Sequence, residues 1–527
     1  MPVSPLFLCF AASVLLIVVR YVVKKRRSND DVHLVPGPPS AEGHWLWGHE
    51  RDIAHNNVSG LYTRWFREYG PVVRHKGALL HPDILSIADP VTLKYVLNDN
   101  YTNFTKSVYL RPLVDRLMGK GIVWAEGDLH KRYRKALAPA FGPAHLREMA
   151  DPIFDMANSL RHRLASCLQE SGGSSTLDVN EYVQSFALDV VCKLQFNHDT
   201  QGGTSEDAKA IADAWSDQIN EGLKSSSFYG LLVLRMFPSL GILPLSYFKA
   251  QSDIKKILSR NSMKYIVSND SGMKEEGSEL TFLALLLKRI NAKGATKLSV
   301  IEVVENINTL LIGGFETTSG AIKMCLYDLA MNMDVQTKLR EELVSFGREE
   351  PDFEELLTGS RLPYLDAVVK ESIRLHPTGG TTDRVATNDD VLPLSQPIEL
   401  PSGEQVHQIH IRAGQLIQLP MRAINVWEEG ERFWPERWLN KETAPSKLGG
   451  WSNMSSFSEG PRMCLGWKLA VLEMKIAIFT LVKDFSFCDT GDTIETRIST
   501  TYQTRVVGRE HEGAQLPMKV SLLEKSG

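Results

Sequence analysis

Residues 457–466 read Phe457-Ser-Glu-Gly460-Pro-Arg462-Met-Cys464-Leu-Gly466, and this stretch decides which fold the chain is expected to adopt. A cysteine that binds a metal as a thiolate needs hydrogen-bond donors or positive potential near its sulfur. The two glycines allow a tight loop whose backbone amides can point at the sulfur of Cys464. A lone cysteine is most often a small buried hydrophobic residue, so the context of Cys464 must distinguish that role from a metal-bound thiolate.

The residues that follow Cys464 are expected to form a helix. Apolar side chains from Leu465 to Phe479 recur at the spacing of one helix face. Cys464 then lies just before a helix N-terminus, where the helix dipole favours a negative charge. The loop and the helix together predict that Cys464 is the ligand of a metal ion.

A second motif, Gly313-Gly-Phe-Glu316-Thr317-Thr, lies within a long apolar stretch. Ser299 and Glu302 have the spacing of a capping box, which predicts that a helix begins there. A glycine inside a helix costs roughly 1 kcal/mol relative to alanine, so two adjacent ones need a physical reason. One reason is bare backbone where a ligand approaches closely, and the alternative is a tight helix crossing in the core.

Two further stretches carry paired charges. Glu371-Ser-Ile-Arg374 places an acid and a base on one helix face, and Phe433-Trp-Pro-Glu-Arg437-Trp follows later in the chain. The four motifs, in their order along the chain, resemble those of the cytochrome P-450 family. The chain is most similar in general to the microsomal fungal members of that family. By that resemblance Glu371, Arg374 and Arg437 interlock behind the loop of Cys464 and do no chemistry themselves.

The resemblance implies a mainly α fold with a smaller β region, the cytochrome P-450 fold. It also implies haem b as cofactor, with Cys464 as the axial ligand of the iron. The implied catalytic residues are Thr317 and Glu316, a hydroxyl and a carboxylate that relay protons towards bound dioxygen. The implied walls of the substrate pocket are Ser107–Trp124, Thr309–Thr317, Thr378–Thr382 and Thr500–Tyr502.

Six residues are implied to contact the haem. They are Phe457, Arg462, His130, Arg134, Arg384 and Gly466. The arginines suit the haem propionates because a guanidinium bonds a carboxylate through two parallel N–H groups. His130 stands where the family often has tryptophan, a departure that keeps a donor, and its spacing to Arg134 puts both on one helix face. For each arginine taken alone, the alternative is a solvated surface role.

The expected activity is that of a monooxygenase that uses O2 and NADPH electrons to hydroxylate or otherwise oxidise a small lipophilic molecule. A terpenoid, steroid-like or polycyclic aromatic substrate is expected, in secondary metabolism or xenobiotic oxidation. Two alternatives stay open. One is a haem-thiolate isomerase or dehydratase that rearranges peroxides and has less use for Thr317, and the other is a non-catalytic haem-binding protein.

The sequence shows no nucleotide-binding glycine loop and no fused flavin domain, so a separate protein is expected to supply electrons. The expected partner is NADPH–cytochrome reductase, with cytochrome b5 as an alternative donor. Lys131, Arg132, Lys135 and Lys468 are expected to form a basic docking face for that partner. The formal charge of −4, from 59 basic and 63 acidic residues, gives no basic excess that would indicate nucleic-acid binding.

The N-terminus predicts a membrane anchor. Residues 5–23 are almost wholly apolar and long enough to span a bilayer if Arg20 reaches the interface. A basic cluster and a proline-rich hinge follow over residues 24–39, and residues 40–527 are expected to form the catalytic domain. Because the positive charges follow the apolar run, a cleaved signal peptide is disfavoured and the domain is expected to face the cytosol. This predicts a single-pass protein of the endoplasmic reticulum membrane.

The rest of the chain predicts mostly helices. Residues from about 130 to 380 have helical spacing, Leu392 to Leu419 reads as short strands, and Ile498 to Val507 reads as a final hairpin. Phe228 to Leu245 is strongly apolar but broken by glycine and proline. It is interpreted either as part of the core or as a loop that dips into lipid.

Overall fold

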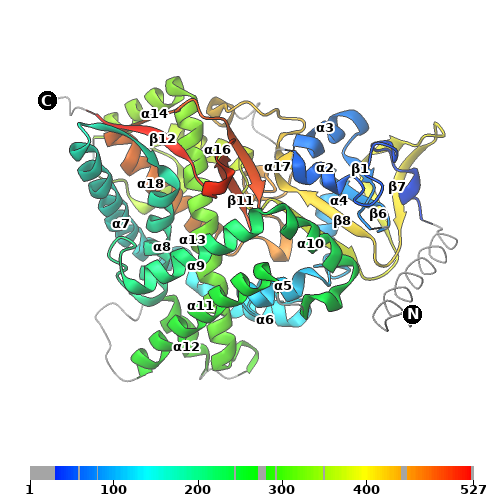
Figure 1. The fold of residues 1–527 in the computed structure, drawn as a ribbon, viewed down its shortest axis with the longest axis horizontal. Coiled ribbons are helices and arrows are strands. Elements are labelled where there is room, and N and C mark those ends of the chain that lie inside the picture. The colour runs from blue at the N-terminus through cyan, green and yellow to red at the C-terminus, as the bar shows by residue number, and fades with distance from the viewer. Residues whose placement is uncertain are drawn as a thin grey trace, which may run out of the picture.

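A computed structural model describes residues 30–56, 60–79, 81–242, 245–270, 281–290, 294–347, 350–440 and 448–523. Helices make up most of these residues, and strands from both halves of the chain gather at one end (Figure 1). The predicted fold class, mainly α with a smaller β region, is confirmed. The predicted anchor, residues 5–23, lies outside the described residues. Within the described ranges, none of the helices is long and apolar enough to cross a bilayer.

The helices in the middle of the chain carry most of the structure. They are α5 (Leu110–Leu117), α6 (Gly127–Leu137), α7 (Pro143–Glu170), α8 (Val179–Phe196), α9 (Glu206–Leu223), α10 (Ser225–Met236), α11 (Ser246–Asp270), α12 (Phe282–Ile290), α13 (Val300–Met331), α14 (Met333–Ser345), α15 (Phe353–Thr358), α16 (Pro363–Leu375), α17 (Met421–Val426) and α18 (Trp467–Asp484). Three short helices near the N-terminus are α2 (Glu50–His55), α3 (Gly60–Tyr69) and α4 (Pro90–Lys94). The predicted helix after Cys464 corresponds to α18.

Helix α13 runs through the centre of the molecule (Figure 1). It begins with the predicted capping box, in which the Ser299 hydroxyl and the Glu302 carboxylate each bond the other residue's backbone amide. A Cβ on Gly314 would lie 2.8 Å from Cγ2 of Val191 on α8, whereas a Cβ on Gly313 would meet nothing within 4 Å. The tight helix crossing is therefore confirmed for Gly314, whereas Gly313 leaves open space and the approach of a ligand to it stays a prediction.

The largest sheet has five strands in the order β1-β2-β8-β5-β3. They are β1 (Val72–His75), β2 (Ile84–Ile87), β8 (Leu416–Pro420), β5 (Thr381–Ala386) and β3 (Phe104–Thr105), and only the β2–β8 pair is parallel. A hairpin of β6 (Asp390–Glu399) and β7 (Gln405–Ile411) lies near it in Figure 1. The strands expected between Leu392 and Leu419 are thus present.

Two smaller sheets lie on the helical side. The first contains β4 (Ser174–Asp178), β12 (Pro517–Leu522) and β9 (Phe485–Cys488), and the second is the hairpin of β10 (Ile494–Ile498) and β11 (Tyr502–Val506). The second confirms the predicted final hairpin. Its turn, residues 499–501, comes close to α13, because the Thr501 hydroxyl bonds the Glu316 carboxylate.

The apolar segment from Phe228 forms α10 and then a short 3-10 turn. Leu232 and Leu234 are buried, whereas Leu240 and Leu245 are 38% and 45% exposed. The segment therefore contributes to the core through α10 and presents apolar side chains to solvent beyond it.

Candidate active site

The loop that carries Cys464 is held in one conformation by its glycine and its backbone bonds. Gly460 has φ of +67°, and a Cβ there would lie 2.5 Å from the Leu97 carbonyl oxygen, so no other residue fits. The Cys464 amide donates to the Phe457 carbonyl oxygen at 2.8 Å, which closes the loop. Gly466 then caps α18. The local sequence thus places Cys464 just before the N-terminus of α18, as predicted.

The Cys464 side chain is accessible, yet the surrounding protein desolvates its thiol. Burial raises the pKa of that thiol above its usual value, although the Gly466 amide and the Arg134 guanidinium act to lower it. The sulfur therefore lies on the wall of an internal hollow rather than on the outer surface. A thiol in this setting loses its proton when a cation binds it, which fits a metal ligand.

The predicted charge network behind the loop is confirmed. Arg374 donates to both Glu371 carboxylate oxygens at 2.9 Å, and Arg437 Nε donates to Oε1 at 3.1 Å. All three side chains are buried. Asn425 joins this network to the loop, because its amide donates to the Arg374 carbonyl oxygen at 3.1 Å and accepts from the Ser455 amide at 2.9 Å. The network therefore fixes the chain shortly before Cys464.

Buried cations converge beside the loop. Arg462 and Lys106 share the carboxylate of Glu126, and the Arg462 Nε is buried without a partner. Burial, followed by repulsion from Arg462, Arg384 and Arg111, lowers the pKa of Lys106 to about 6. Burial likewise lowers the pKa of Arg384 to about 10. Two basic side chains share Glu126 and the Arg462 Nε has no partner in the part of the chain that the structure describes, so the site fits a bound group that carries carboxylates, as a haem does.

The other two predicted propionate residues lie next to this cluster. Arg134 donates from Nη1 to the Met463 carbonyl oxygen at 2.7 Å, so it also supports the loop. His130 is buried, and burial together with Lys106 and Arg134 lowers its pKa to about 4. It is therefore neutral near pH 7 and has one ring N–H to donate. Phe457 packs edge to face on Trp451, with ring centroids 5.4 Å apart.

Helix α13 presents its motif next to open space. The Thr317 hydroxyl donates to the Gly313 carbonyl oxygen at 2.6 Å, beside the open space that Gly313 leaves. Leu465, the residue after Cys464, packs in the same apolar cluster as Leu311 and Phe315 of this helix. The sulfur and the motif therefore border one region of the molecule.

Glu316 is placed differently from the expectation. Its carboxylate is buried and accepts hydrogen bonds from the Trp215 indole, the Thr501 hydroxyl and the Gln503 amide. Among the contacts of the described residues, no hydrogen bond joins it to the Thr317 hydroxyl. The reason is helical geometry, because successive side chains point about 100° apart around the axis.

A sequence profile of the family "Cytochrome P450" matches residues 38–516 of this chain. The chain belongs to the cytochrome P450 family. Cytochrome P450 monooxygenase 128 of Postia placenta is 31% identical to it over 512 residues, covering 92% of each chain. Cytochrome P450 monooxygenase claP of Ampulloclitocybe clavipes is 31% identical over 491 residues, covering 89% of each chain. Several related proteins therefore carry the name of monooxygenases, and the family implies haem iron with a thiolate ligand.

The four segments expected to line a P450 substrate pocket meet in pairs. A Cβ on Gly121 would lie 2.2 Å from the Thr309 hydroxyl oxygen, so the first segment touches α13. A Cβ on Gly380 would lie 3.1 Å from the Tyr502 ring, so the third and fourth segments also touch. Gly121 and Gly380 thus allow the close approach of these segments.

The motifs gave no indication of Lys106 as part of this P450 site. It lies in the stretch Phe104-Thr-Lys-Ser107, which contains no other charged residue. Its side chain is only 14% exposed, which is unusual for lysine and is the structural signal that singles it out. The sequence alone could not show this burial, because the other members of the cluster come from distant segments.

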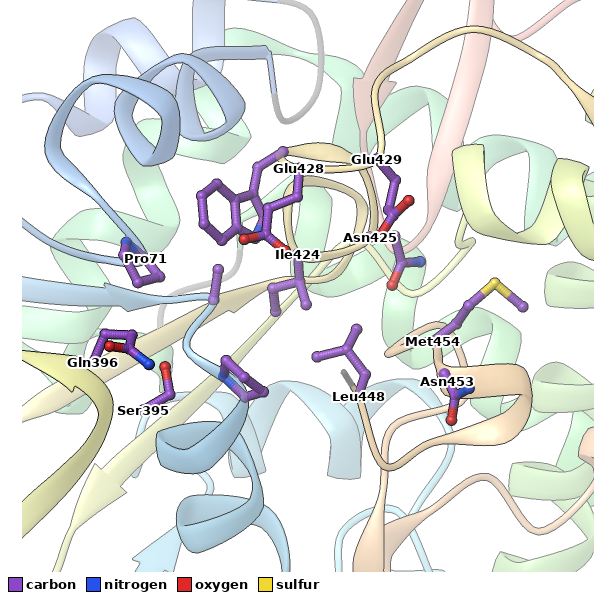
Figure 2. Close-up of a pocket in the computed structure, with 13 residues that line it drawn as sticks. Pro71, Ser395, Gln396, Ile424, Asn425, Glu428, Glu429, Leu448, Asn453 and Met454 are labelled. Atoms are coloured by element: carbon purple, nitrogen blue, oxygen red, sulfur yellow. The ribbon is translucent and has the colours of Figure 1, made fainter. Parts of the chain in front are cut away.

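Figure 2 shows a hollow whose lining includes none of residues 457–466. It has a volume of about 330 Å³ and lies between Pro71, the end of α17 and the segment around Met454. None of the predicted catalytic or haem-contacting residues is among those described as lining it. The chemistry of the donor groups, rather than the size of this hollow, therefore locates the active site.

Proposed function

We propose that this P450 is a haem-thiolate monooxygenase that oxidises a small lipophilic molecule. The observation that carries the proposal is the arrangement around one hollow. Cys464 lies on its wall, a cluster of buried basic side chains that includes the unpartnered Arg462 Nε lies beside the Cys464 loop, and the Thr317 motif of α13 borders the same region. A metal-bearing, anionic, flat cofactor satisfies all three sets of groups.

Each chain residue has a definite task in this proposal. Cys464 binds the iron of haem b, and Phe457 and Gly466 shape the proximal side. The propionates are bound by the set of basic residues Arg462, His130, Arg134, Arg384 and Lys106. When bound, a haem with an axial thiolate activates dioxygen, so that one oxygen atom enters the substrate and the other leaves as water.

Thr317 and Glu316 handle protons. The Thr317 hydroxyl, which donates to the Gly313 carbonyl oxygen, presents its own oxygen as an acceptor and relay beside the open face at Gly313. Glu316 is the nearest carboxylate along the helix and supplies protons to that hydroxyl once its side chain turns. Neither residue is needed for a peroxide rearrangement, so their presence favours the monooxygenase over that alternative.

The walls favour a lipophilic substrate of the terpenoid, steroid-like or polycyclic aromatic kind. The pocket side of α13 combines Leu311 and Phe315 of an apolar cluster with the bare backbone of Gly313. The Thr378–Thr382 segment adds small polar side chains. Screening such compounds for NADPH-dependent product formation tests this assignment, and turnover restricted to charged, water-soluble compounds would contradict it.

Residues 5–23 are proposed to anchor the chain in the endoplasmic reticulum membrane, with the catalytic domain in the cytosol. In support, Trp45 is 78% exposed, and Leu240 and Leu245 beyond α10 are also exposed. Trp47 and Tyr229 are in ring contact, with centroids 4.7 Å apart, which places these two apolar segments together. Digestion of the domain by protease added outside sealed microsomes is expected, and full protection would refute the orientation.

An NADPH–cytochrome reductase, with cytochrome b5 as an alternative, is proposed to deliver electrons at the face that bears Lys131, Lys135 and Lys468. Arg132, expected on the same face, pairs with Glu302 and donates to the Lys297 carbonyl oxygen at 2.9 Å, and Lys131 pairs with Asp128 at 3.1 Å, so part of the positive charge of this face is already neutralised. Reversal of charge at Lys131 and Lys135 should weaken reductase binding and its salt dependence. Unchanged affinity would remove the face from the proposal.

The carbon monoxide difference spectrum of the reduced protein tests the central assignment. We expect a band at about 450 nm, which indicates a thiolate ligand. This band should be lost in Cys464→Ala. Cys192→Ala, a change at a buried cysteine elsewhere, is the control and should keep the band. Absence of the band from folded, haem-supplemented wild-type protein would refute the thiolate assignment and the proposed function with it.

A further inference from the structure

Three donors hold the Glu316 carboxylate about 100° around the axis of α13 from the direction of Thr317. The Thr501 hydroxyl and the Gln503 amide each donate to Oε1 at 2.6 Å, and the Trp215 indole donates to Oε2. All four side chains are buried. Hydrogen bonds to a charged group contribute more than neutral ones, so this set favours one rotamer of Glu316 strongly.

A buried lysine stands behind these donors. Lys323 lies two turns further along α13 on the same face as Glu316. Its ammonium donates to the side-chain oxygen Oε1 of Gln503 at 3.2 Å and to Oδ1 of Asn180 at 2.8 Å. The Gln503 amide is therefore polarised, with its oxygen towards the cation and its nitrogen towards the carboxylate. Burial lowers the pKa of Lys323, and the charges of Glu316 and Asp178 oppose that shift.

Two of the donors, Thr501 and Gln503, belong to the β10–β11 hairpin, whose residues 500–502 form one of the expected walls of the substrate pocket. Thr501 ends the turn between β10 and β11, and the next residue, Tyr502, contacts Gly380 of the opposite wall segment. Thr501 is also bonded to Gln503, whose amide donates to its hydroxyl at 2.7 Å. The hydroxyl then donates onward to Glu316, so the position of the turn and the rotamer of Glu316 are mechanically linked.

We infer that Thr501, Gln503 and Lys323 are positioning residues that hold Glu316 away from Thr317 and so restrain proton supply while the pocket is empty. The inference rests on the proposed function. In the empty enzyme, oxygen that accepts two electrons from NADPH and two protons leaves as hydrogen peroxide, while NADPH becomes NADP+. While these three residues hold its carboxylate, Glu316 does not pass protons to Thr317. This slows the oxidation of NADPH in the absence of substrate.

Removal of one donor should release Glu316 measurably. A hydrogen bond to a charged group corresponds to about a tenfold change in the ratio of released to held carboxylate. The variant is Thr501→Val, and the matched control is Thr504→Val in the same hairpin. Thr504 is also buried, but its hydroxyl oxygen has no partner within the described residues, so the loss of this hydroxyl does not affect the bonds of Glu316.

The first readout needs neither haem nor turnover. The chain has ten tryptophans, and the indole N–H signal of Trp215 can be assigned in an NMR spectrum of nitrogen-15-labelled protein by comparison with Trp215→Phe. The strong bond to Glu316 predicts a low-field proton shift for Trp215. Thr501→Val should move this signal towards the free-indole position, and Thr504→Val should leave it unchanged. An unmoved signal in Thr501→Val would overturn the inference.

The second readout is NADPH oxidation without substrate, measured with reductase and normalised to the band near 450 nm. We expect it to rise at least about threefold in Thr501→Val and in Lys323→Met and to stay unchanged in Thr504→Val. Lys475→Met, a change at another buried lysine, controls for general loss of stability. A moved Trp215 signal with unchanged NADPH oxidation would show that the hold is only structural and would overturn the inference. Absence of the band in every variant, wild type included, would instead refute the proposed function.

Discussion

Lys106 allows a sharp test of how the protein binds its cofactor. Its pKa falls from an ordinary 10.5 to about 6 because the side chain is buried and faces Arg462, Arg384 and Arg111. In haem-free protein at about pH 8 its amine is therefore mostly neutral. Two propionates beside it add negative charge and restore the proton. Haem binding should then take up a proton at Lys106 over the range from about pH 6 upward.

The sign and the size follow from linkage. Because the haem-bound state holds the extra proton, haem affinity should fall as the pH rises, by up to about tenfold per pH unit for this one group. Lys106→Met removes the group and hence this dependence. Other groups that titrate on binding contribute to both proteins alike, so they cancel in the comparison. The slope of log Kd against pH should differ by about one between wild type and variant.

The assay is a haem titration of haem-free protein, followed by quenching of tryptophan fluorescence, at three pH values from about 7 to about 9. Lys120→Met is the matched control, since Lys120 is a nearby lysine that is 54% exposed. It should show the wild-type slope. Equal slopes for wild type and Lys106→Met, or a steeper loss of affinity in the variant, would refute the assignment of Lys106 to the propionate site.

Three further outcomes follow from the contacts around the site. Glu371→Gln leaves two buried arginines without their shared carboxylate and should lower the free energy of unfolding in urea by about 3–5 kcal/mol; a loss below about 1 kcal/mol would contradict the network. Gly314→Ala should cost about 1–3 kcal/mol in the same assay because its Cβ meets α8, whereas Gly313→Ala should gain up to about 1 kcal/mol; equal effects would refute the division of roles. Burial acts to raise the pKa of Glu302, but its hydrogen bonds, above all the one from Arg132, lower that pKa to about 2. Glu302 therefore contributes stability above about pH 4.5 that is lost as the pH falls towards 2, and Glu302→Gln should flatten that part of the denaturation curve.

The parts of the site that could be predicted are those whose residues lie close in sequence. The Cys464 loop depends on a glycine at 460 and a helix start at 467, both of which are local properties. The capping box of α13 is likewise local, since Ser299 and Glu302 are three positions apart. Glu371, Arg374 and Arg437 were found because a resemblance joined two separate motifs; their spacing alone indicates only a helix-face pair.

The parts that were missed depend on packing between distant segments. Lys106 is singled out by its burial beside Arg462 and Arg384, which lie hundreds of residues away in the chain. Its partner Glu126 comes from the residue before α6. The strands β1 to β3 were not predicted either, because two- to four-residue strands are too short to establish a period of two. Short strands gain their identity from the neighbour to which they bond.

The motif of α13 shows why one short sequence can carry several functions. Residues of a helix point about 100° apart, so the five positions from Gly313 to Thr317 face all round the axis. Gly313 leaves open backbone, Gly314 admits α8, Glu316 reaches the β10–β11 turn and Thr317 bonds back to the Gly313 carbonyl oxygen. Each of these residues contacts a different neighbour. Substitutions at different positions of the motif should therefore affect stability, substrate fit and proton supply independently of one another. Adjacent positions with correlated effects on all three would mean that the motif acts as a single rigid unit instead.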